Sequence, residues 1–381
     1  MIKILLLIDY SSEFDRKLLR GLVQYSKENG PWLFYRLPSY YSAMHGEQGI
    51  LRWAKEWKAD AIIGQWNNDT IDLQKELNIP VVLQNYHHRS VTYSNLTGDY
   101  KGTGRMAAQF FAKRMFRNFA YFGVKGVVWS DERCEGYRQE VKRIGGEFFS
   151  FESDKQEDEI RMEVSRWLQE LPKPVALFCC DDAHALFISE TCKMTNIPIP
   201  EDIALLGVDN DELMCNISDP PISSIELEVE RGGYSIGRLI HQQIKKEHEG
   251  TFNIVINPIR IELRQSTEKH NIKDPYILEV VKYIESHYSS DLTIESLLAN
   301  IPLSRRNFEV KFKNALNTSI YQYILNCRCN HLADLLLTTD RPLADLAMEV
   351  GFTDYNNIAR IFKKFKGCSP IEYRQKKTRQ R

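Results

Sequence analysis

Polar and aromatic side chains follow the short apolar runs of residues 1–270 at the points where those runs end. Carboxylate, amide and guanidinium groups make paired hydrogen bonds to neighbouring hydroxyls, and aromatic faces cover the C–H side of a sugar ring. The pattern therefore favours a site for a small polyhydroxylated ligand. The candidate ligand-binding residues are Asp9, Tyr10, Gln65, Trp66, Trp129, Arg133, Asp181, Asp209 and Asn210.

Each of these residues also has a simpler structural explanation when it is taken alone. An Asp directly after a strand commonly caps the next helix, and we weigh capping and ligand contact equally for Asp181 and Asp182. Trp66 and Trp129 can be ordinary core or surface aromatics. The prediction of a ligand site therefore rests on the collective pattern.

The elements that must position these residues alternate between strand and helix. Such alternation predicts parallel sheets, which bind ligands at the carboxyl ends of their strands. The expected strands span residues 2–8, 61–64, 81–84, 119–123, 147–151, 176–180 and 203–208, and the expected helices span 16–27, 106–115 and 159–171. Trp129 and Arg133 are expected in a loop, within the segment GVVWSDERCEGY.

Motifs for cofactors and metals are missing from the sequence. No G-x-G-x-x-G or G-x-x-x-x-G-K-[ST] segment supports nucleotide binding. None of the eight cysteines forms a C-x-x-C, and no Cys/His cluster has zinc-ligand spacing. We therefore expect no cofactor and no metal, and reduced thiols in a cytoplasmic protein.

Two other classes of protein are weighed against a regulatory one. An enzyme acting on sugars would need paired carboxylates, but neighbours such as Asp181 and Asp182 rarely present both groups to one bond. A secreted transport component would need an export signal, and the apolar run from Ile4 to Ile8 is too short for a signal peptide or a membrane span. The cytoplasm is thus the expected location.

Charge divides the chain into two unlike parts. Residues 271–381 contain 17 Lys and Arg against 12 Asp and Glu, whereas residues 1–270 contain 33 against 39. A basic module attached to an acidic one often meets nucleic acid, although a solvated surface explains the same numbers.

Residues 275–381 read as helical throughout, with two helix-turn-helix units. In the first, a short helix over 293–299 precedes a helix capped by Ser304, with Phe308 and Phe312 pointing inward. In the second, a helix over 342–352 precedes one capped by Asp354. The alternative is a helical bundle with a solvated basic face. The candidate DNA-binding residues are Ser304, Arg305, Arg306, Asn307, Lys311, Tyr355, Asn356, Asn357, Arg360, Lys363 and Lys364.

The segments 97–123, 133–137 and 197–213 look like the effector domain of LacI-type repressors, which is similar to periplasmic sugar-binding proteins. The resemblance implies two α/β lobes and sugar contacts by Arg133, in R-x-x-G-[YWF], and by Asp209, in G-[VFI]-D. That family's DNA-binding headpiece has no counterpart before the first strand, so DNA binding is expected elsewhere.

The segment RPLADLAMEVGFTDYNNIARIFKKFKGCSPIEYR (341–374) resembles the DNA-binding domain of the AraC/XylS family, as do residues 303–313 and 328–343. The combination resembles the xylose-operon regulators of bacteria, which share W-x-x-E-R (129–133) and G-[IV]-D-N-[DE]-E (207–212). This implies a homodimeric activator that binds a pentose, D-xylose before L-arabinose or another sugar, and operator DNA. RNA polymerase is a further possible partner.

The expected fold is therefore a two-lobed α/β domain of the periplasmic-binding-protein type followed by an all-α domain with two helix-turn-helix units. The expected boundaries are residues 1–268 for the effector domain, 269–275 for the linker and 276–376 for the DNA-binding domain.

Overall fold

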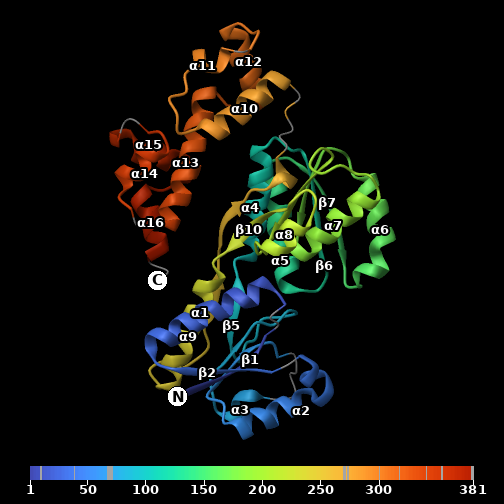
Figure 1. Cartoon of the computed structure of the whole chain (residues 1–381), viewed down its shortest axis with the longest axis vertical. Coiled ribbons are helices and arrows are strands. Elements are labelled where there is room, and N and C mark those ends of the chain that lie inside the picture. The colour runs from blue at the N-terminus through green and yellow to red at the C-terminus, as the bar shows by residue number, and fades with distance from the viewer. Residues whose placement is uncertain are drawn as a thin grey trace. The chain divides into compact units, whose positions relative to one another are not determined.

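A computed structural model of the 381-residue chain divides it into two compact units, residues 1–269 and 270–381 (Figure 1). The structure describes residues 1–8, 11–37, 39–66, 72–268, 272, 274–299, 301–316, 318–339, 341–352 and 355–378. Within these ranges it describes the backbone alone for residues 39–45, 74, 337–338, 355–356 and 375–378.

The first unit contains an N-lobe whose sheet is parallel between all neighbouring strands. Its strand order is β11 (Asn253–Ile256), β5 (Ser94–Gly98), β4 (Val81–Leu83), β3 (Ala61–Gly64), β1 (Ile2–Leu7) and β2 (Trp32–Arg36). Helices α1 (Glu13–Asn29) and α9 (Val229–Ile244) cover one face, and α2 (Ser39–Trp57) and α3 (Leu73–Leu77) cover the other.

The C-lobe of the same unit repeats this plan with one antiparallel edge. Its strand order is β12 (Pro258–Glu262), β10 (Ser223–Leu227), β9 (Ile203–Val208), β8 (Val175–Cys179), β6 (Asn118–Val124) and β7 (Glu147–Ser153). Only the β10–β12 pairing is antiparallel among the described strands of this sheet. The helices are α4 (Tyr100–Lys113), α5 (Val128–Arg143), α6 (Glu157–Glu170), α7 (Asp182–Met194) and α8 (Glu212–Ile217).

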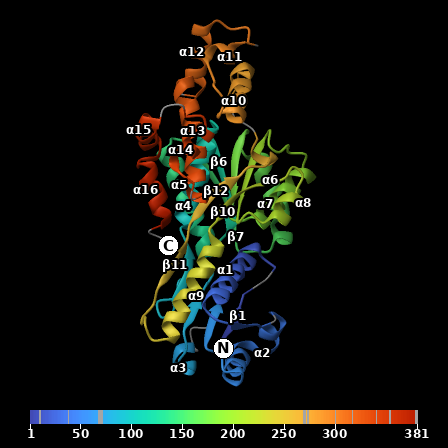
Figure 2. The ribbon, with the colours of Figure 1, turned by 60° about the vertical axis from the view of Figure 1, so that its left-hand side comes forward.

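The backbone passes between the lobes after β5, after β10 and between β11 and β12 (Figures 1 and 2). These crossings are hydrogen-bonded to one another, since Asp99 N donates to Ile256 O at 2.9 Å and Glu228 N donates to Asn257 O at 3.0 Å. Adjacent crossings of this kind make a hinge, where a few residues take up the rotation of one lobe against the other.

Each lobe packs a pair of helices against each other through glycines. A Cβ on Gly21 of α1 would lie 1.8 Å from Glu230 O of α9, and one on Gly104 of α4 would lie 2.1 Å from Arg133 O of α5. Any larger residue would push the helices apart, because packed interiors leave no room for an added carbon. These contacts set the positions of α1 and α5, which carry charged residues to the site.

The predicted strands are present, with ends that shift by one or two residues. Strands β2, β5, β10, β11 and β12 were not predicted. The segments SNLTG of β5 and SSIEL of β10 lack an apolar run, whereas WLFYR of β2 and NIVI of β11 contain apolar residues that the prediction did not use. The placement of Trp129 and Arg133 in a loop is wrong: both residues lie in α5. The buried face of that helix is largely small and polar, so it shows no apolar periodicity.

The second unit is all-helical and matches the predicted order of helices. It consists of α10 (Pro275–His287), α11 (Ile294–Leu298), α12 (Arg305–Leu316), α13 (Ile320–Thr338), α14 (Leu343–Glu349), α15 (Tyr355–Lys366) and α16 (Pro370–Thr378). Phe308 and Phe312 are buried as predicted, and Ile358 and Phe362 of α15 are buried too. The expected cap at Asp354 lies outside the described residues.

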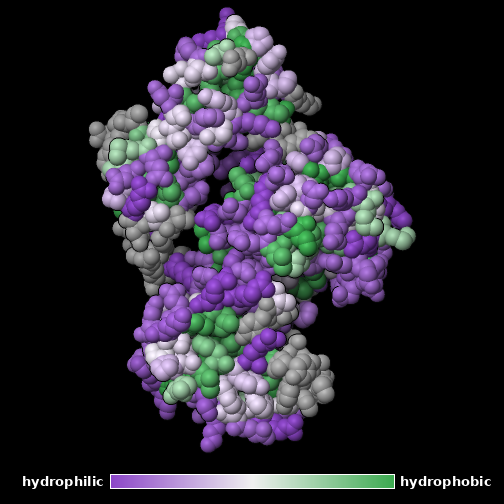
Figure 3. All heavy atoms as spheres, in the orientation of Figure 1, coloured by the Kyte–Doolittle hydropathy of each residue, from purple (hydrophilic) through white to green (hydrophobic). Residues whose placement is uncertain are grey.

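In the space-filling view of Figure 3, hydrophilic residues cover much of the face shown. No helix in the described ranges is both long enough and apolar enough to span a membrane.

Candidate functional site

Arg133 lies at the centre of the candidate ligand site. Its side chain is 4% exposed, and its guanidinium lies 5.4 Å from the ring centroid of Trp129 and 5.5 Å from that of Tyr100. One terminal nitrogen, Nη1, donates to the carbonyl of Cys180, while Nη2 lies 3.6 Å from Asp209 Oδ1. A guanidinium held between two ring faces and a carboxylate is fixed in orientation before any ligand arrives.

Part of this ion pair is still open to a further partner. Asp209 Oδ1 and Arg133 Nε are buried and make no hydrogen bond within the described part of the chain. Buried polar atoms are normally hydrogen-bonded, so each such atom needs an explanation. A ligand hydroxyl that donates to Asp209 and accepts from Arg133 would satisfy both.

Asp209 stands in a strained turn directly after β9. Its φ is +98° and that of Asn210 is +48°, a region that costs most side chains free energy but that Asp and Asn tolerate best. Burial raises the pKa of Asp209 to about 6, although the nearby Arg133 opposes the shift. The Asp209 side chain is therefore mostly ionised at neutral pH and becomes protonated in mild acid.

Asp181 caps α7, so the capping role that was weighed against ligand contact is present. Its Oδ1 accepts hydrogen bonds from His184 N at 2.8 Å and from His184 Nδ1 at 2.7 Å. Burial would raise the pKa of Asp181, but His184 holds it below its usual value. Burial would lower the pKa of His184, but Cys180 and Asp181 raise it well above its usual value. Ligand contact by Asp181 stays a prediction, and the cap itself uses Oδ1.

Cys180, Asp181 and His184 form the one group in the described residues with the chemistry of a metal site. One ligand atom from each lies within 4.8 Å of the others. However, Asp181 and His184 are already bonded to each other, and Cys180 is completely buried. The group is therefore accounted for as an ion pair at the start of a helix.

The N-lobe contributes less to the described site. Trp66 is 4% exposed and belongs to the core beside α2, and its backbone N donates to Asn85 Oδ1 at 3.1 Å. Gln65 is half-buried, with its backbone N donating to Leu7 O. Asp9 and Tyr10 lie outside the described residues.

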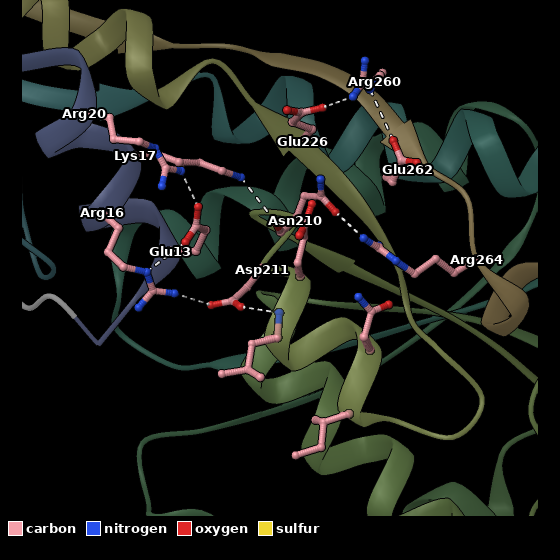
Figure 4. A pocket seen from close by; sticks show the side chains of 14 residues that line it. Glu13, Arg16, Lys17, Arg20, Asn210, Asp211, Glu226, Arg260, Glu262 and Arg264 are labelled. Carbon is pink, nitrogen blue, oxygen red and sulfur yellow. Dashed lines mark hydrogen bonds and ion pairs between the residues drawn. The ribbon is translucent and has the colours of Figure 1, made fainter. Parts of the chain in front are cut away.

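A cavity of about 1070 Å³ lies beside the Arg133–Asp209 pair, between α1 of the N-lobe and the loop that follows β9 (Figure 4). Its lining includes Asn210 but neither Arg133 nor Asp209. Charged side chains dominate the lining, with Arg16, Lys17 and Arg264 among them. The cavity is thus adjacent to the Arg133–Asp209 pair but separate from it.

The predicted DNA-binding residues of the first helix-turn-helix unit differ in whether they are already ion-paired. Arg305 is 61% exposed but pairs with Glu295 at 2.8 Å and with Glu309 at 3.1 Å. Lys311 pairs with Asp274 at 2.7 Å. Ser304, Arg306 and Asn307 are exposed, and Arg306 forms no ion pair within the described part of the chain.

In the second helix-turn-helix unit, Arg360, Lys363 and Lys364 are exposed on α15. Lys364 Nζ donates to Gln322 Oε1 at 2.7 Å. Asn357 is half-buried. The side chains of the other two candidates, Tyr355 and Asn356, lie outside the described residues.

Known protein families match both units. A helix-turn-helix domain matches residues 297–376, and a periplasmic binding protein-like domain matches residues 108–267. The xylose operon regulatory protein of Escherichia coli K12 is 24% identical over 98% of this chain and 96% of its own length. That of Haemophilus influenzae is 23% identical over 98% of both chains. A solved structure titled as the xylose-binding transcription activator xylR covers 98% of this chain and 97% of its own, with TM-score 0.60 and 22% identity.

The chain is a helix-turn-helix transcriptional regulator with a periplasmic-binding-protein-like domain. The predicted pairing of these two domain types, and a regulator rather than an enzyme, are thereby confirmed. In this regulator the predicted Arg133, Trp129 and Asp209 are brought together. Sequence reasoning missed Tyr100, which covers Arg133, and Arg264, which holds Asn210. An aromatic residue two positions after the strand end at Gly98 was the available signal for Tyr100.

Proposed function

We propose that this regulator is a cytoplasmic, sugar-responsive activator that binds a pentose next to Arg133 and Asp209 and operator DNA through α12 and α15. The observation that supports the ligand site best is the buried Arg133–Asp209 pair, 3.6 Å apart, with a donor and an acceptor unused. Such a pair favours vicinal hydroxyls, because a site built to hydrogen-bond hydroxyls discriminates strongly against ligands that lack them.

D-xylose is the first candidate among pentoses. The two named relatives regulate xylose operons, and the similar solved structure is that of a xylose-binding activator. Those properties belong to those proteins, and here they support a proposal. L-arabinose or another sugar remains the alternative effector, since small changes in a cleft alter which hydroxyls are satisfied.

The proposed mechanism is closure of the two lobes around the sugar. A ligand shifts the equilibrium between open and closed forms only by its difference in affinity for the two. In a homodimer, closure would place two DNA-binding units so that they engage operator half-sites together. Activation also requires RNA polymerase as a partner, for which no residue is assigned.

The proposed division of labour on DNA follows side-chain type. Ser304, Arg306 and Asn307 at the start of α12 would contact base edges, since Arg suits guanine and Asn suits adenine. Arg305 would first have to leave Glu295 and Glu309. Tyr355, Asn356 and Asn357 are proposed to read bases from α15, and Lys311, Arg360, Lys363 and Lys364 to hold phosphates.

A thermal-shift screen of the purified protein tests the ligand proposal directly. A ligand that binds only the folded state raises the unfolding midpoint. We expect D-xylose to raise it more than L-arabinose, D-ribose, D-glucose or xylobiose at equal concentration. The shift should vanish in Arg133→Ala.

Arg138→Ala is the matched control, because Arg138 lies on the same helix, is exposed and pairs only with Glu135 among the described residues. Its shift with D-xylose should equal that of the unmodified protein. If no sugar shifts the unmodified protein, the proposed effector class is wrong. If Arg138→Ala loses the shift as well, the effect of Arg133→Ala does not locate the site.

A further inference from the structure

The three-residue loop Asp209–Asp211 is contacted from both lobes and from the segment that leaves the first unit (Figure 4). This ligand loop carries the proposed sugar contact Asp209 on its side chain. Asn210 and Asp211, the other two residues of the loop, line the charged cavity instead. The loop therefore has two sets of partners, one for the ligand and one for the protein.

Helix α1 of the N-lobe holds the ligand loop from one side. Lys17 Nζ donates to the carbonyl of Asp209 at 2.7 Å and to that of Asn210 at 3.3 Å. Arg16 Nη2 lies 3.3 Å from Asp211 Oδ2. Gly21 packs α1 closely against α9, so α1 moves together with the N-lobe. The contacts of Lys17 and Arg16 with the ligand loop therefore depend on the position of the whole N-lobe.

Arg264 holds the ligand loop from the other side. Its Nη2 donates to Asn210 Oδ1 at 2.8 Å, and its Nη1 donates to Ile222 O at 2.9 Å. One planar guanidinium thus bridges the ligand loop and the start of β10, a geometry that lysine cannot reproduce. Its backbone N donates to Ser223 Oγ at 2.8 Å.

The residues after Arg264 are fixed by buried hydroxyl groups. Ser266 Oγ donates to Leu205 O at 2.6 Å, and Ser223 Oγ lies 2.6 Å from Thr267 Oγ1. All three hydroxyl residues are at most 1% exposed. The 3-10 helix η1 (Gln265–Thr267) is therefore tied to β9 and β10 immediately before the chain continues into the second unit.

The ligand loop has the conformational properties of a switch. Two successive residues other than glycine, Asp209 and Asn210, have positive φ, a conformation that persists only where surrounding contacts require it. Asp211 N is also held by Asp182 Oδ2 at 2.7 Å, so the far end of the loop is anchored in α7. Opening of the two lobes would remove the α1 contacts and leave the strained half of the loop free to relax.

We propose that Arg264 is a positioning residue that couples sugar binding to DNA binding, by transmitting the conformation of the ligand loop to residues 264–268. This inference rests on the proposed function and adds its route of regulation. Arg264 contacts Asn210 and not the proposed hydroxyl-binding atoms of Arg133 and Asp209. Replacing Arg264 should leave sugar binding intact while removing the effect of the sugar on operator binding.

The test measures sugar affinity and operator affinity separately in the full-length protein, using Arg264→Met and Arg264→Lys. Coupling is the ratio of operator dissociation constants without and with saturating D-xylose, and typical couplings are about 5- to 150-fold. We expect this ratio to fall to within about twofold of unity in Arg264→Met. The dissociation constant for D-xylose should change by less than about threefold.

Arg260→Met is the matched control. Arg260 lies in β12, lines the same cavity and pairs with Glu226 at 2.8 Å and Glu262 at 3.4 Å, but it does not contact the ligand loop. Its coupling should equal that of the unmodified protein. Arg264→Lys keeps the positive charge but cannot make the two directed hydrogen bonds of the guanidinium. It should therefore lose the coupling as well, which keeps the test valid even if Arg264→Met folds poorly.

Each outcome decides something. Coupling that survives in both Arg264 variants overturns this inference alone. Loss of D-xylose binding in Arg264→Lys with an intact melting transition also overturns it, because Arg264 would then belong to the binding site. Absence of any sugar response in the unmodified protein overturns the proposed function and this inference with it.

Discussion

The same residue type works in opposite surroundings in the two units of this regulator. Arg133 of the first unit has a side chain 4% exposed, against the carboxylate of Asp209 and two aromatic rings. Arg305 of the second unit is 61% exposed, between Glu295 and Glu309. Breaking a buried pair costs about 3–5 kcal/mol, whereas an exposed pair contributes about 0–1 kcal/mol.

The buried arginine is preorganised for one ligand, whereas the exposed arginine can exchange its partners. A buried pair cannot rearrange cheaply, so it must be complementary to its ligand in advance. An exposed arginine can leave its glutamates for a phosphate or a base at small cost, because water and salt already screen those pairs. Substitutions in the first unit should therefore have larger and more pH-sensitive effects than substitutions in the second.

The largest effect is expected from Asp209→Asn. Asn tolerates the positive φ at this position, so the loop is preserved while the charge is lost. A hydrogen bond to a buried charged group contributes about 1.5–3 kcal/mol, so the D-xylose dissociation constant should rise by up to about 100-fold. Calorimetric titration measures it. An unchanged constant would show that the sugar does not contact Asp209.

Next in size is Arg306→Ala. Arg306 is exposed and has no ion pair within the described residues, so its contribution should be to base recognition alone. One bidentate contact contributes about 1–3 kcal/mol of discrimination, and an exposed one should lie at the lower end, near tenfold. Operator and scrambled DNA compared by fluorescence anisotropy give the ratio. Retained operator preference would contradict the placement of the reading face on α12.

A smaller effect is expected from pH. Burial raises the pKa of Asp209 to about 6, and a sugar hydroxyl donates a stronger hydrogen bond to the ionised carboxylate than to the neutral acid. Affinity for D-xylose should therefore fall by up to about fourfold from pH 7.5 to pH 5.5. His184 and Asp181 have their pKa values shifted away from this window, upward and downward respectively, so neither should titrate in it.

Asp209→Asn is the control for this pH dependence and should abolish it. The same raised pKa makes the ligand-free fold lose stability as pH rises from about 4 to about 6, since the native state holds the proton more tightly than the unfolded chain. A sugar affinity that is flat over the range in the unmodified protein would place the titrating group away from the ligand.

The smallest effect is expected from Lys363→Ala. Lys363 is exposed near the C-terminal end of α15, and a phosphate contact carries no sequence information. All DNA should bind more weakly by a similar factor, about threefold at moderate salt, and the slope of log affinity against log salt should fall by about one. Salt titrations with operator and scrambled DNA measure both. A loss confined to operator DNA would make Lys363 a base reader.

The second unit was the more predictable part of the fold. Its helices follow local rules: apolar residues at helical spacing, Ser369 and Glu372 capping each other at the start of α16, and Gly367 with φ +79° after α15. These signals act within a few residues of each other. A sequence alone therefore carries them, and the predicted helices are all present.

In the first unit, polar buried segments were the hardest part to predict. Strand β5 was missed because Ser94, Asn95 and Thr97 are buried in it, and the buried amide of Asn95 bonds to Asn253, 158 residues away. Helix α5 was missed because its buried face has no apolar stripe: it meets α4 through Gly136, and its Ser130 is hydrogen-bonded to Tyr121 and Val124 of β6. Polar burial of this kind depends on partners that are distant in sequence.

The sequence by itself determined the residue types of the site and the order of the two domains, because motifs, apolar runs and caps are local properties. Only the tertiary structure decided which of those residues meet. It brings Arg133 to 3.6 Å from Asp209, turns Asn210 toward Arg264 and sets Lys17 against the ligand loop. The physical reason is that these contacts join strands and helices whose separation is set by packing across the sheets, and packing distances are not written in any single segment.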